Sequence, residues 1–267
     1  MDLLLVRHGE SEGNIAIEAA KVGDDRWMTS EYRERSAANY RLTPTGREQA
    51  TRAGEWLREW TSRRGGFDRL YCSPFVRTRE TAGLLGVHNA QWQLEPLLRE
   101  RDFGLWEGLG KPEIEKRFPH SFAQKSRHKF LWRPECGEST PDLDMRAREV
   151  LASLAREMSG RRVLCVTHED IIWAFKFRLE KMTLEVFLAH QEGEGKDIPN
   201  CGIVHYTRRR QDGSVSPKFA RVRLVDPSSP GKPVWQPITR PRFSNDDLLD
   251  QVGEYAHLWE NRPGFEF

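Results

Sequence analysis

The chain has few cysteines and no long apolar run, and these absences exclude several classes of protein. Its 267 residues include four cysteines, which lie far apart and form no C-x-x-C pair. We therefore expect neither a disulfide framework nor a zinc site. No apolar stretch approaches the length of a membrane span, and the N-terminus lacks the basic and apolar regions of a signal peptide. We expect a cytoplasmic protein with no membrane partner.

An excess of one charge is also missing. The 42 Lys and Arg residues nearly balance the 40 Asp and Glu residues, which leaves a formal net charge of +2. This balance gives no reason to expect a nucleic acid as partner, and the run Arg208-Arg209-Arg210 is expected on a solvated turn. Hydrophobic residues make up 37% of the chain, enough to bury the core of a globular α/β protein.

Short apolar runs alternate with helical patterns along the chain. The runs at 3–6, 67–72 and 163–166 are typical of strands buried on both faces. The clearest helix begins at Thr43-Pro44, where an N-cap residue precedes a proline in the first turn. This alternation predicts an α/β fold in three layers, α/β/α, with a mostly parallel central sheet.

We expect a single catalytic domain over residues 1–206. Two segments without clean periodicity, at about 15–41 and 109–135, are predicted insertions near the site, and the second forms a small cap. Residues 207–267 are predicted to form a C-terminal extension, made of a hairpin, a Pro-rich linker and a helix that packs on the same domain.

Basic side chains follow three of the predicted strands. Arg7 and His8 follow the first strand, Arg77 the second and His168 the third. In open α/β sheets, ligands bind outside the carboxyl ends of the strands. Arginine suits bidentate contact with phosphate oxygens, and a neutral imidazole can act as a nucleophile while a second one donates a hydrogen bond. The sequence therefore predicts a site for phosphoryl transfer through nitrogen.

The residues around these histidines suggest further contacts and one competing site. Ser11 and Asn14 add uncharged hydrogen-bonding groups to the predicted phosphate site. A metal ion at His168, Glu169 and Asp170 is the competing interpretation. Adjacent side chains point in different directions, and nearby arginines disfavour a cation. We therefore predict no metal ligands and no cofactor.

Six motifs occur in an order and spacing that resemble a known family, the histidine phosphatase superfamily, also called phosphoglycerate mutase-like. The resemblance covers about residues 3–206. The motifs are Arg7-His8-Gly9-Glu10-Ser11 with Asn14, Leu42 to Ala50, Ser73 to Ala82, Glu100 to Gly104, Gly137-Glu138-Ser139 and His168.

The resemblance implies a role for each residue of the predicted site. His8 is expected to be the nucleophile that becomes phosphohistidine. Arg7, Arg77 and His168 are expected to form the phosphate pocket, helped by Asn14. Glu100 is expected to protonate the leaving alkoxide and then to activate water. The expected activity is metal-independent hydrolysis of a phosphomonoester, with a small phosphorylated metabolite as partner.

The sequence departs from the family pattern after the second histidine. Many relatives have glycine there, whereas this chain has Glu169. A carboxylate at that place repels phosphate unless it points away or pairs with a base such as Arg7.

Two alternative functions stay open. The segment Gly104 to Gly108 resembles the phosphatase branches and favours hydrolysis over a phosphoglycerate mutase, although Lys111 lies where mutases place a substrate lysine. A non-catalytic phosphate-ligand binding protein with the same fold is the other alternative. The sequence leaves the substrate and the oligomeric state open.

Overall fold

The computed structural model describes residues 1–191, 198–229, 231 and 233–253. Its centre is a seven-stranded sheet in the order β3-β2-β4-β1-β5-β6-β7. Strands β3, β2, β4 and β1 run parallel, and β5, β6 and β7 continue the sheet with antiparallel pairing. The strands are β1 (Asp2–Arg7), β2 (Arg69–Cys72), β3 (Trp92–Leu94), β4 (Arg162–Thr167), β5 (Ile203–Thr207), β6 (Arg221–Val225) and β7 (Gln236–Pro237).

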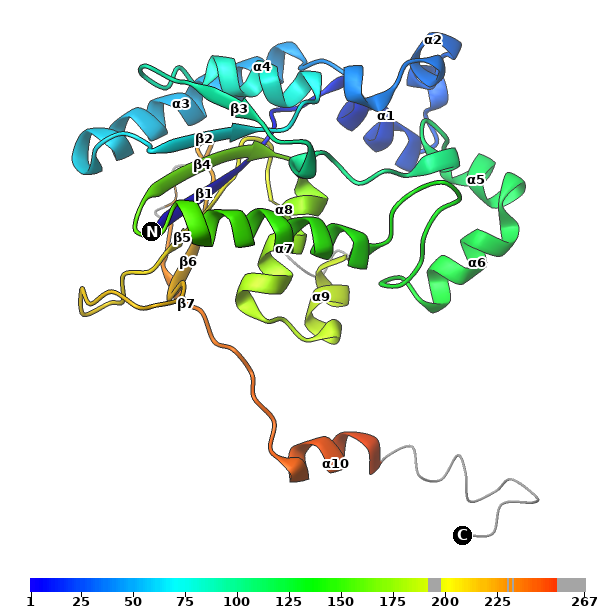
Figure 1. Cartoon of the computed structure of the whole chain (residues 1–267). Coiled ribbons are helices and arrows are strands. Elements are labelled where there is room, and N and C mark those ends of the chain that lie inside the picture. The colour runs from blue at the N-terminus through cyan, green and yellow to red at the C-terminus, as the bar shows by residue number, and fades with distance from the viewer. Residues whose placement is uncertain (192–197, 230, 232, 254–267) are drawn as a thin grey trace, which may run out of the picture.

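Helices cover both faces of the sheet (Figure 1). The α-helices are α1 (Glu12–Lys21), α2 (Ser30–Glu34), α3 (Pro44–Arg64), α4 (Val76–Leu84), α5 (Lys111–Arg117), α6 (Pro119–Arg127), α7 (Thr140–Glu157), α8 (Glu169–Glu180), α9 (Leu184–Gln191) and α10 (Asn245–Gly253). Four short 3-10 helices are η1 (Asp25–Trp27), η2 (Ala37–Asn39), η3 (Pro96–Leu98) and η4 (Gly104–Trp106). This architecture confirms the predicted α/β/α fold.

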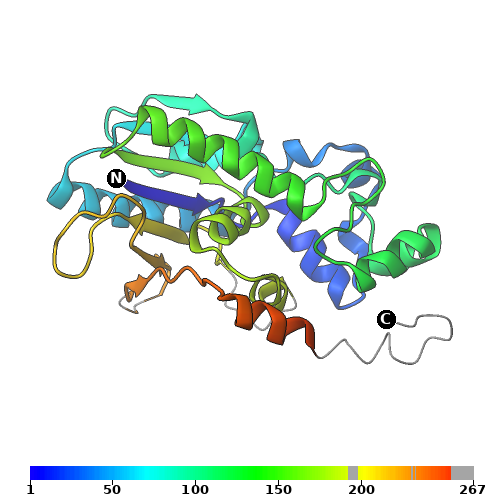
Figure 2. The same cartoon turned by 60° about the horizontal axis from the view of Figure 1, so that its bottom comes forward.

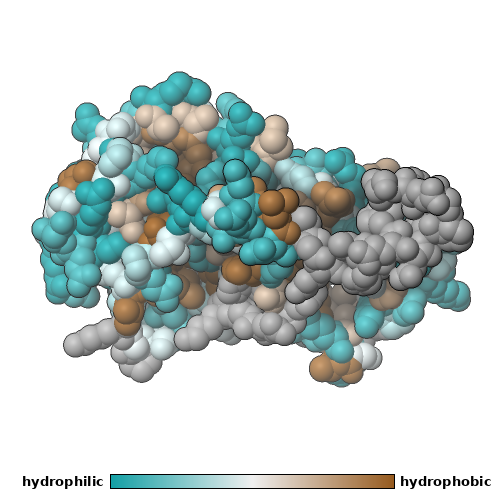
Figure 3. Space-filling model, turned by 90° about the horizontal axis from the view of Figure 1, so that it is seen from below, coloured by the Kyte–Doolittle hydropathy of each residue, from teal (hydrophilic) through white to brown (hydrophobic). Residues whose placement is uncertain are grey.

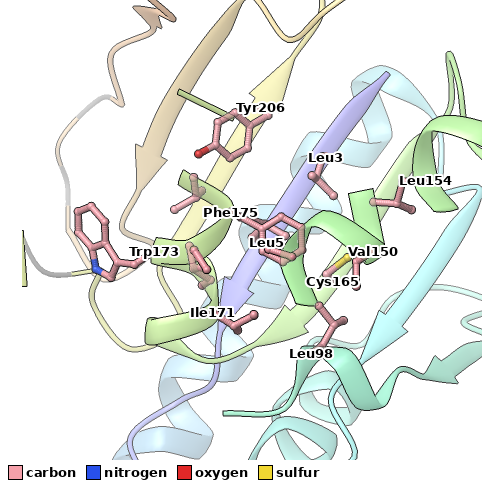
Figure 4. Packing of buried hydrophobic residues seen from close by; sticks show 14 of the residues in the cluster. Leu3, Leu5, Leu98, Val150, Leu154, Cys165, Ile171, Trp173, Phe175 and Tyr206 are labelled. Atoms are coloured by element: carbon pink, nitrogen blue, oxygen red, sulfur yellow. The ribbon is translucent and has the colours of Figure 1, made fainter. Parts of the chain in front are cut away.

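Strand β1 lies in the middle of the sheet and sends alternate side chains to the two faces. Leu3 and Leu5 belong to the core under α7 and α8, where Figure 4 shows them beside Phe175. Leu4 and Val6 belong to the opposite core, which α3 and α4 cover. All four residues from Leu3 to Val6 are fully buried. The packed strand therefore fixes the position of the backbone at Arg7, its last residue, and at His8, which follows it.

The start of α3 is set by the residues that predict it. Thr43 is the N-cap, its hydroxyl accepts a hydrogen bond from the Gly46 amide at 3.0 Å, and Pro44 occupies the first turn. The same Thr43 hydroxyl lies 2.7 Å from the Glu10 carboxylate. Capping the helix therefore also attaches it to the loop that follows His8.

Both predicted insertions lie at the same end of the molecule (Figure 2). The first contains most of α1, which begins at Glu12 just before it, followed by η1, α2 and η2. Tyr32 and Tyr40 stack at 4.6 Å between ring centroids and form a small core with Met28 and Ala16. The second insertion contains α5 and α6.

The C-terminal extension contributes to the sheet but its helix does not pack as expected. Strand β6 pairs with β5 along its whole length, from Thr207↔Arg221 to Ile203↔Val225. Helix α10 lies apart from the sheet in Figure 1, and its apolar residues Leu248 and Leu249 are 51% and 66% exposed. The expected packing of the extension is therefore wrong for α10.

The surface agrees with the charged composition. On the face shown in Figure 3, hydrophilic residues predominate among those described, and apolar residues lie in small groups. Among the described helices, none is long and apolar enough to span a membrane.

The loop after His8 packs tightly on the first turn of α3. A Cβ atom added at Gly46 would overlap the Glu10 carbonyl oxygen, and one added at Gly9 would overlap the Gly46 carbonyl oxygen. Only residues without a side chain allow the two backbones to approach so closely.

Replacing Gly46 by alanine is expected to lower the free energy of unfolding by about 1–3 kcal/mol, because backbone atoms of two elements must move apart. Denaturant unfolding measures the loss. Gly83→Ala on α4 is the matched control, since nothing lies within 4 Å of the Cβ it would add and alanine favours a helix. Equal stability of the two variants would contradict this account of the packing.

Candidate active site

The carboxyl ends of three neighbouring parallel strands bring the predicted site residues together. Arg7 at the end of β1 pairs in register with Thr167 of β4, and Cys72 of β2 pairs with Val166. The residues that follow these strands therefore meet at one edge of the sheet, as predicted. His8 and His168 lie there with ring centroids 5.1 Å apart.

The contacts of His8 define which ring nitrogen is free to react. Nδ1 lies 2.7 Å from the Gly9 carbonyl oxygen, which can only accept a hydrogen bond, so Nδ1 carries the proton. Nε2 then holds a lone pair, and it accepts a hydrogen bond from Arg77 Nε at 3.1 Å. Burial and the neighbouring guanidinium groups of Arg77 and Arg7 lower the pKa of His8 well below 6.5. The imidazole is therefore neutral near pH 7.

His168 also has one ring nitrogen in a hydrogen bond with a neighbouring residue. Its Nε2 lies 2.8 Å from the Ser73 hydroxyl, which can donate a hydrogen bond to it. With Ser73 as the donor, the proton of the neutral ring is on Nδ1, which faces Glu100 Oε2 at 3.8 Å. The side chain is fully buried, and burial, followed by the charge of Arg77, lowers its pKa well below 6.5. Nδ1 has no hydrogen-bond partner among the described residues.

Arg77 follows β2, in the first turn of α4, and is buried at this edge. Besides donating to His8, its Nη1 donates to the Ala37 carbonyl oxygen at 2.7 Å, and its guanidinium lies over the Phe75 ring. The first insertion, through η2, therefore helps to orient the arginine.

Glu169 pairs with Arg7, the base that the sequence suggested for it. Arg7 Nη1 lies 2.7 Å from Glu169 Oε2, and both side chains are largely buried. Arg7 Nη1 also donates to the Ile198 carbonyl oxygen. The carboxylate after the second histidine thus neutralises part of the charge on one of the two arginines.

Glu100 lies beside the two histidines with its side chain 19% exposed. One carboxyl oxygen accepts a hydrogen bond from the Arg101 amide at 2.9 Å. Burial and the negative charge of Asp170 raise the pKa of Glu100 to about 8, against the lowering effect of Arg77. Near pH 7 the carboxyl group is mostly protonated and can donate a proton.

Ser11 and Asn14 lie next to His8, where they form the capping box of α1. The Ser11 hydroxyl donates to Asn14 Oδ1 at 2.9 Å and accepts from the Asn14 amide. Asn200, which the sequence analysis missed, donates to the His8 carbonyl oxygen at 3.1 Å. It precedes β5, and no local pattern shows that β5 pairs with β1.

These residues border a pocket of about 670 Å³. Six of the predicted residues line it, namely Arg7, His8, Ser11, Asn14, Arg77 and Glu100. The seventh, His168, is fully buried next to His8. The structure therefore places all seven predicted residues in one site.

The metal interpretation based on His168, Glu169 and Asp170 does not match the geometry, since Glu169 pairs with Arg7. A different group, His8, Glu100 and His168, has potential ligand atoms within 4.8 Å of one another. The guanidinium groups of Arg77 and Arg7 lie close to this group, and Arg77 donates a hydrogen bond to His8 Nε2. The positive charge there suits an anion better than a cation.

Comparison with known families and proteins gives a match over most of the chain. The model of the histidine phosphatase superfamily (branch 1) matches residues 3–215. The 2,3-bisphosphoglycerate-dependent phosphoglycerate mutase of Methylorubrum extorquens is 30% identical over 230 residues, which are 84% of this chain and 97% of the relative. The 6-phosphofructo-2-kinase/fructose-2,6-bisphosphatase of Gallus gallus is 32% identical over 170 residues, 64% of this chain and 31% of the relative.

Solved structures share the fold. Phosphoserine phosphatase from Entamoeba histolytica, in complex with 3-phosphoglyceric acid, superposes with a TM-score of 0.58 at 22% identity, covering 82% of this chain and 95% of that chain. A mycobacterial glucosyl-3-phosphoglycerate phosphatase gives a TM-score of 0.59 at 24% identity, covering 77% of this chain and 92% of that one. These findings confirm the resemblance seen in the motifs.

Replacing Glu169 by glutamine is expected to strengthen the binding of inorganic phosphate about three- to tenfold, because Arg7 loses its competing carboxylate. Calorimetric titration with phosphate measures the change. Glu18→Gln is the matched control, since Glu18 lines the same pocket but pairs with the exposed Lys21. Weaker or unchanged phosphate binding in Glu169→Gln would show that this carboxylate does not compete with the anion.

Proposed function

The chain belongs to the histidine phosphatase superfamily (branch 1), and we propose that it is a metal-independent phosphomonoester hydrolase. The observation that carries the proposal is the lone pair on Nε2 of His8. The Gly9 carbonyl fixes the proton on Nδ1, and Arg77 approaches Nε2 from the side where a phosphate would bind. A neutral, oriented imidazole beside two arginines is suited to attack on phosphorus.

In the first step, Arg77 exchanges its hydrogen bond to Nε2 for one to a phosphoryl oxygen. The freed Nε2 lone pair then forms a bond to phosphorus while the bond from phosphorus to the ester oxygen breaks. The positive charge that develops on the imidazole is stabilised by the hydrogen bond from Nδ1–H to the Gly9 carbonyl oxygen. Arg7, Arg77 and Nδ1–H of His168 bind the phosphoryl oxygens, whose negative charge they offset in a largely buried site. Asn14 lies next to them and adds a polar contact.

Glu100 supplies and then removes the proton. In its protonated form it gives a proton to the leaving oxygen, so that an alcohol departs in place of an alkoxide. The resulting carboxylate takes a proton from water, and the water oxygen attacks phosphorus and breaks the bond to nitrogen. The products are an alcohol and inorganic phosphate, and both His8 and Glu100 return to their starting forms.

Hydrolysis is favoured over the mutase reaction by the surroundings of Lys111. This lysine, which suggested a mutase from the sequence, is exposed at the start of α5 and is not among the described residues that line the pocket. Trp106, from the segment that resembles phosphatases, lies at the pocket and packs on Trp132 at 4.5 Å. A phosphoglycerate mutase remains the second candidate, because the relative at 30% identity carries that name.

A binding protein without turnover is the third candidate. Its pocket needs cationic groups for the phosphate but no protonated Glu100 beside the ester oxygen. The raised pKa of Glu100 favours a catalytic role. We further propose a cytoplasmic location and a small phosphorylated metabolite as the partner, without nucleic acid or membrane.

Phosphate release from a panel of phosphomonoesters, measured with a chelator present, tests the proposed reaction. The wild-type protein is expected to release phosphate, and His8→Ala is expected to lose at least about 10³-fold in kcat/KM while remaining folded, because the nucleophile is missing. Conversion of 3-phosphoglycerate to 2-phosphoglycerate with a bisphosphoglycerate primer is measured alongside. Faster interconversion than phosphate release would select the mutase, and silence in both assays would select the binding protein.

Replacing Glu100 by glutamine is expected to lower kcat/KM for the hydrolysis of alkyl phosphates about 10²- to 10⁴-fold. The loss is expected to be far smaller for aryl phosphates, which have good leaving groups. The amide cannot give a proton to an alkoxide. In the wild-type protein, kcat/KM for alkyl esters should fall as pH rises through about 8, where Glu100 loses its proton. In the glutamine variant, kcat/KM for alkyl esters should not fall over this pH range. Equal losses on both ester classes would remove Glu100 from the acid role.

A further inference from the structure

We propose that the alcohol part of the substrate is bulky, apolar and uncharged. This inference rests on the proposed phosphatase function and concerns the part of the pocket beyond the phosphate site. The pocket of about 670 Å³ lies within the range of 300–1,000 Å³ that is typical for sites of drug-sized ligands. A phosphate with a short alcohol would leave most of it filled by water.

One wall of the pocket comes from the first insertion and is apolar. Met28, Tyr32 and Tyr40 line it, and each is more than nine-tenths buried. The two tyrosine rings stack nearly parallel, at 9°, so that their position is fixed before a ligand binds. Ile17 of α1 extends this wall toward the mouth, where it is 52% exposed.

The opposite wall comes from η4 and α5. Phe103, Trp106, Leu109 and Ile114 line the pocket from this side. Trp106 is held in place by its ring contact with Trp132 and by a hydrogen bond from its indole nitrogen to Glu135 at 3.0 Å. Aromatic and aliphatic side chains on both sides create a slot that favours an apolar group.

An ion pair joins the two walls. Arg33 of α2 lies 2.7 Å from Glu113 of α5, and a hydrogen bond connects Ala37 of η2 to the buried Arg77. The insertions therefore form one structure around the space next to His8. The slot adjoins the phosphate site directly, as an ester substrate requires.

The basic residues along these walls already have partners. Lys21 lies 2.6 Å from Glu18, and Arg99 lies 2.6 Å from Glu138. Arg101 donates to the carbonyl oxygen of Glu138 at 2.9 Å. Carboxylates therefore neutralise Lys21 and Arg99, whereas Arg101 is held by a backbone carbonyl and by the rings of Phe103 and Trp132.

Lys125 and two acidic residues also line the pocket. Lys125 lies over the rings of Trp106 and Trp132, at 5.5 and 5.1 Å. Asp102 and Glu107 also face the pocket, and their charges repel an anionic group. The charge pattern therefore disfavours phosphoglycerates and bisphosphorylated sugars, and it agrees with an uncharged alcohol.

A series of n-alkyl phosphates from ethyl to hexyl tests this inference, because the leaving alcohols have nearly the same pKa. We expect kcat/KM for phosphate release to rise about fourfold per buried methylene, on the order of 10²-fold across the series. An alkyl phosphate of matched length with a terminal carboxylate is expected to be hydrolysed at least about tenfold less efficiently than the uncharged ester.

Two variants locate the effect in the slot. Ile17→Asn is expected to lower the ratio of kcat/KM for hexyl phosphate to kcat/KM for ethyl phosphate several-fold. Val186→Asn, at a residue that is 47% exposed on α9 and outside the lining, is the matched control and should leave that ratio as in the wild-type protein.

The outcomes separate this inference from the proposed function. Phosphate release that depends on His8 but does not rise with chain length would overturn the inference and leave the phosphatase function intact. A preference for the carboxylated ester would also overturn it, in favour of an anionic substrate. No release from any ester would overturn the phosphatase function and, with it, this inference.

Discussion

The position of the His8 imidazole depends on how the two residues after it are held. The Gly9 amide donates to the Thr81 hydroxyl of α4 at 3.1 Å, and the Glu10 amide donates to Gln49 of α3 at 2.9 Å. The backbone of Gly9 also packs directly against the backbone of Gly46, with no room for a side chain between them. Two helices on one face of the sheet thus fix the Gly9 carbonyl, and this carbonyl fixes the proton on His8 Nδ1. The reactivity of Nε2 follows from backbone packing.

Positive and negative side chains in the pocket partly offset one another. Two arginines and two neutral histidines face the place where a phosphate would lie, while Glu169 offsets part of the charge on Arg7. Burial keeps both imidazoles neutral and Glu100 protonated. In the proposed reaction, two arginines would attract the incoming phosphate, and the carboxylate on Arg7 would favour release of the phosphate product.

The sequence predicted those parts of the site that depend on local patterns. Strand ends placed Arg7, His8, Arg77 and His168 at one edge of the sheet, because parallel neighbours share their carboxyl ends. Asn200 could not be predicted from the sequence, because its contact with His8 depends on the antiparallel pairing of β5 with β1, two strands far apart in the chain.

Other features depended on contacts that a sequence pattern does not contain. Helix α1 begins directly after its Ser11 N-cap because Asn14 completes the capping box. The stacked tyrosines of the first insertion form a separate small core. The apolar residues of this insertion follow no regular spacing in the sequence, so the sequence analysis did not predict that core. Helix α10 has a regular helical pattern, yet its exposed leucines show that such a pattern does not determine where a helix docks.

Trapping of the phosphorylated protein during turnover tests the central claim most directly. The protein is mixed with a reactive phosphomonoester, quenched within milliseconds and digested, and the phosphorylated atom is identified by mass spectrometry and phosphorus NMR. The account predicts an acid-labile phosphoryl group on Nε2 of His8. Phosphate on Nδ1 of His8, on His168 or on no residue while hydrolysis proceeds would contradict it.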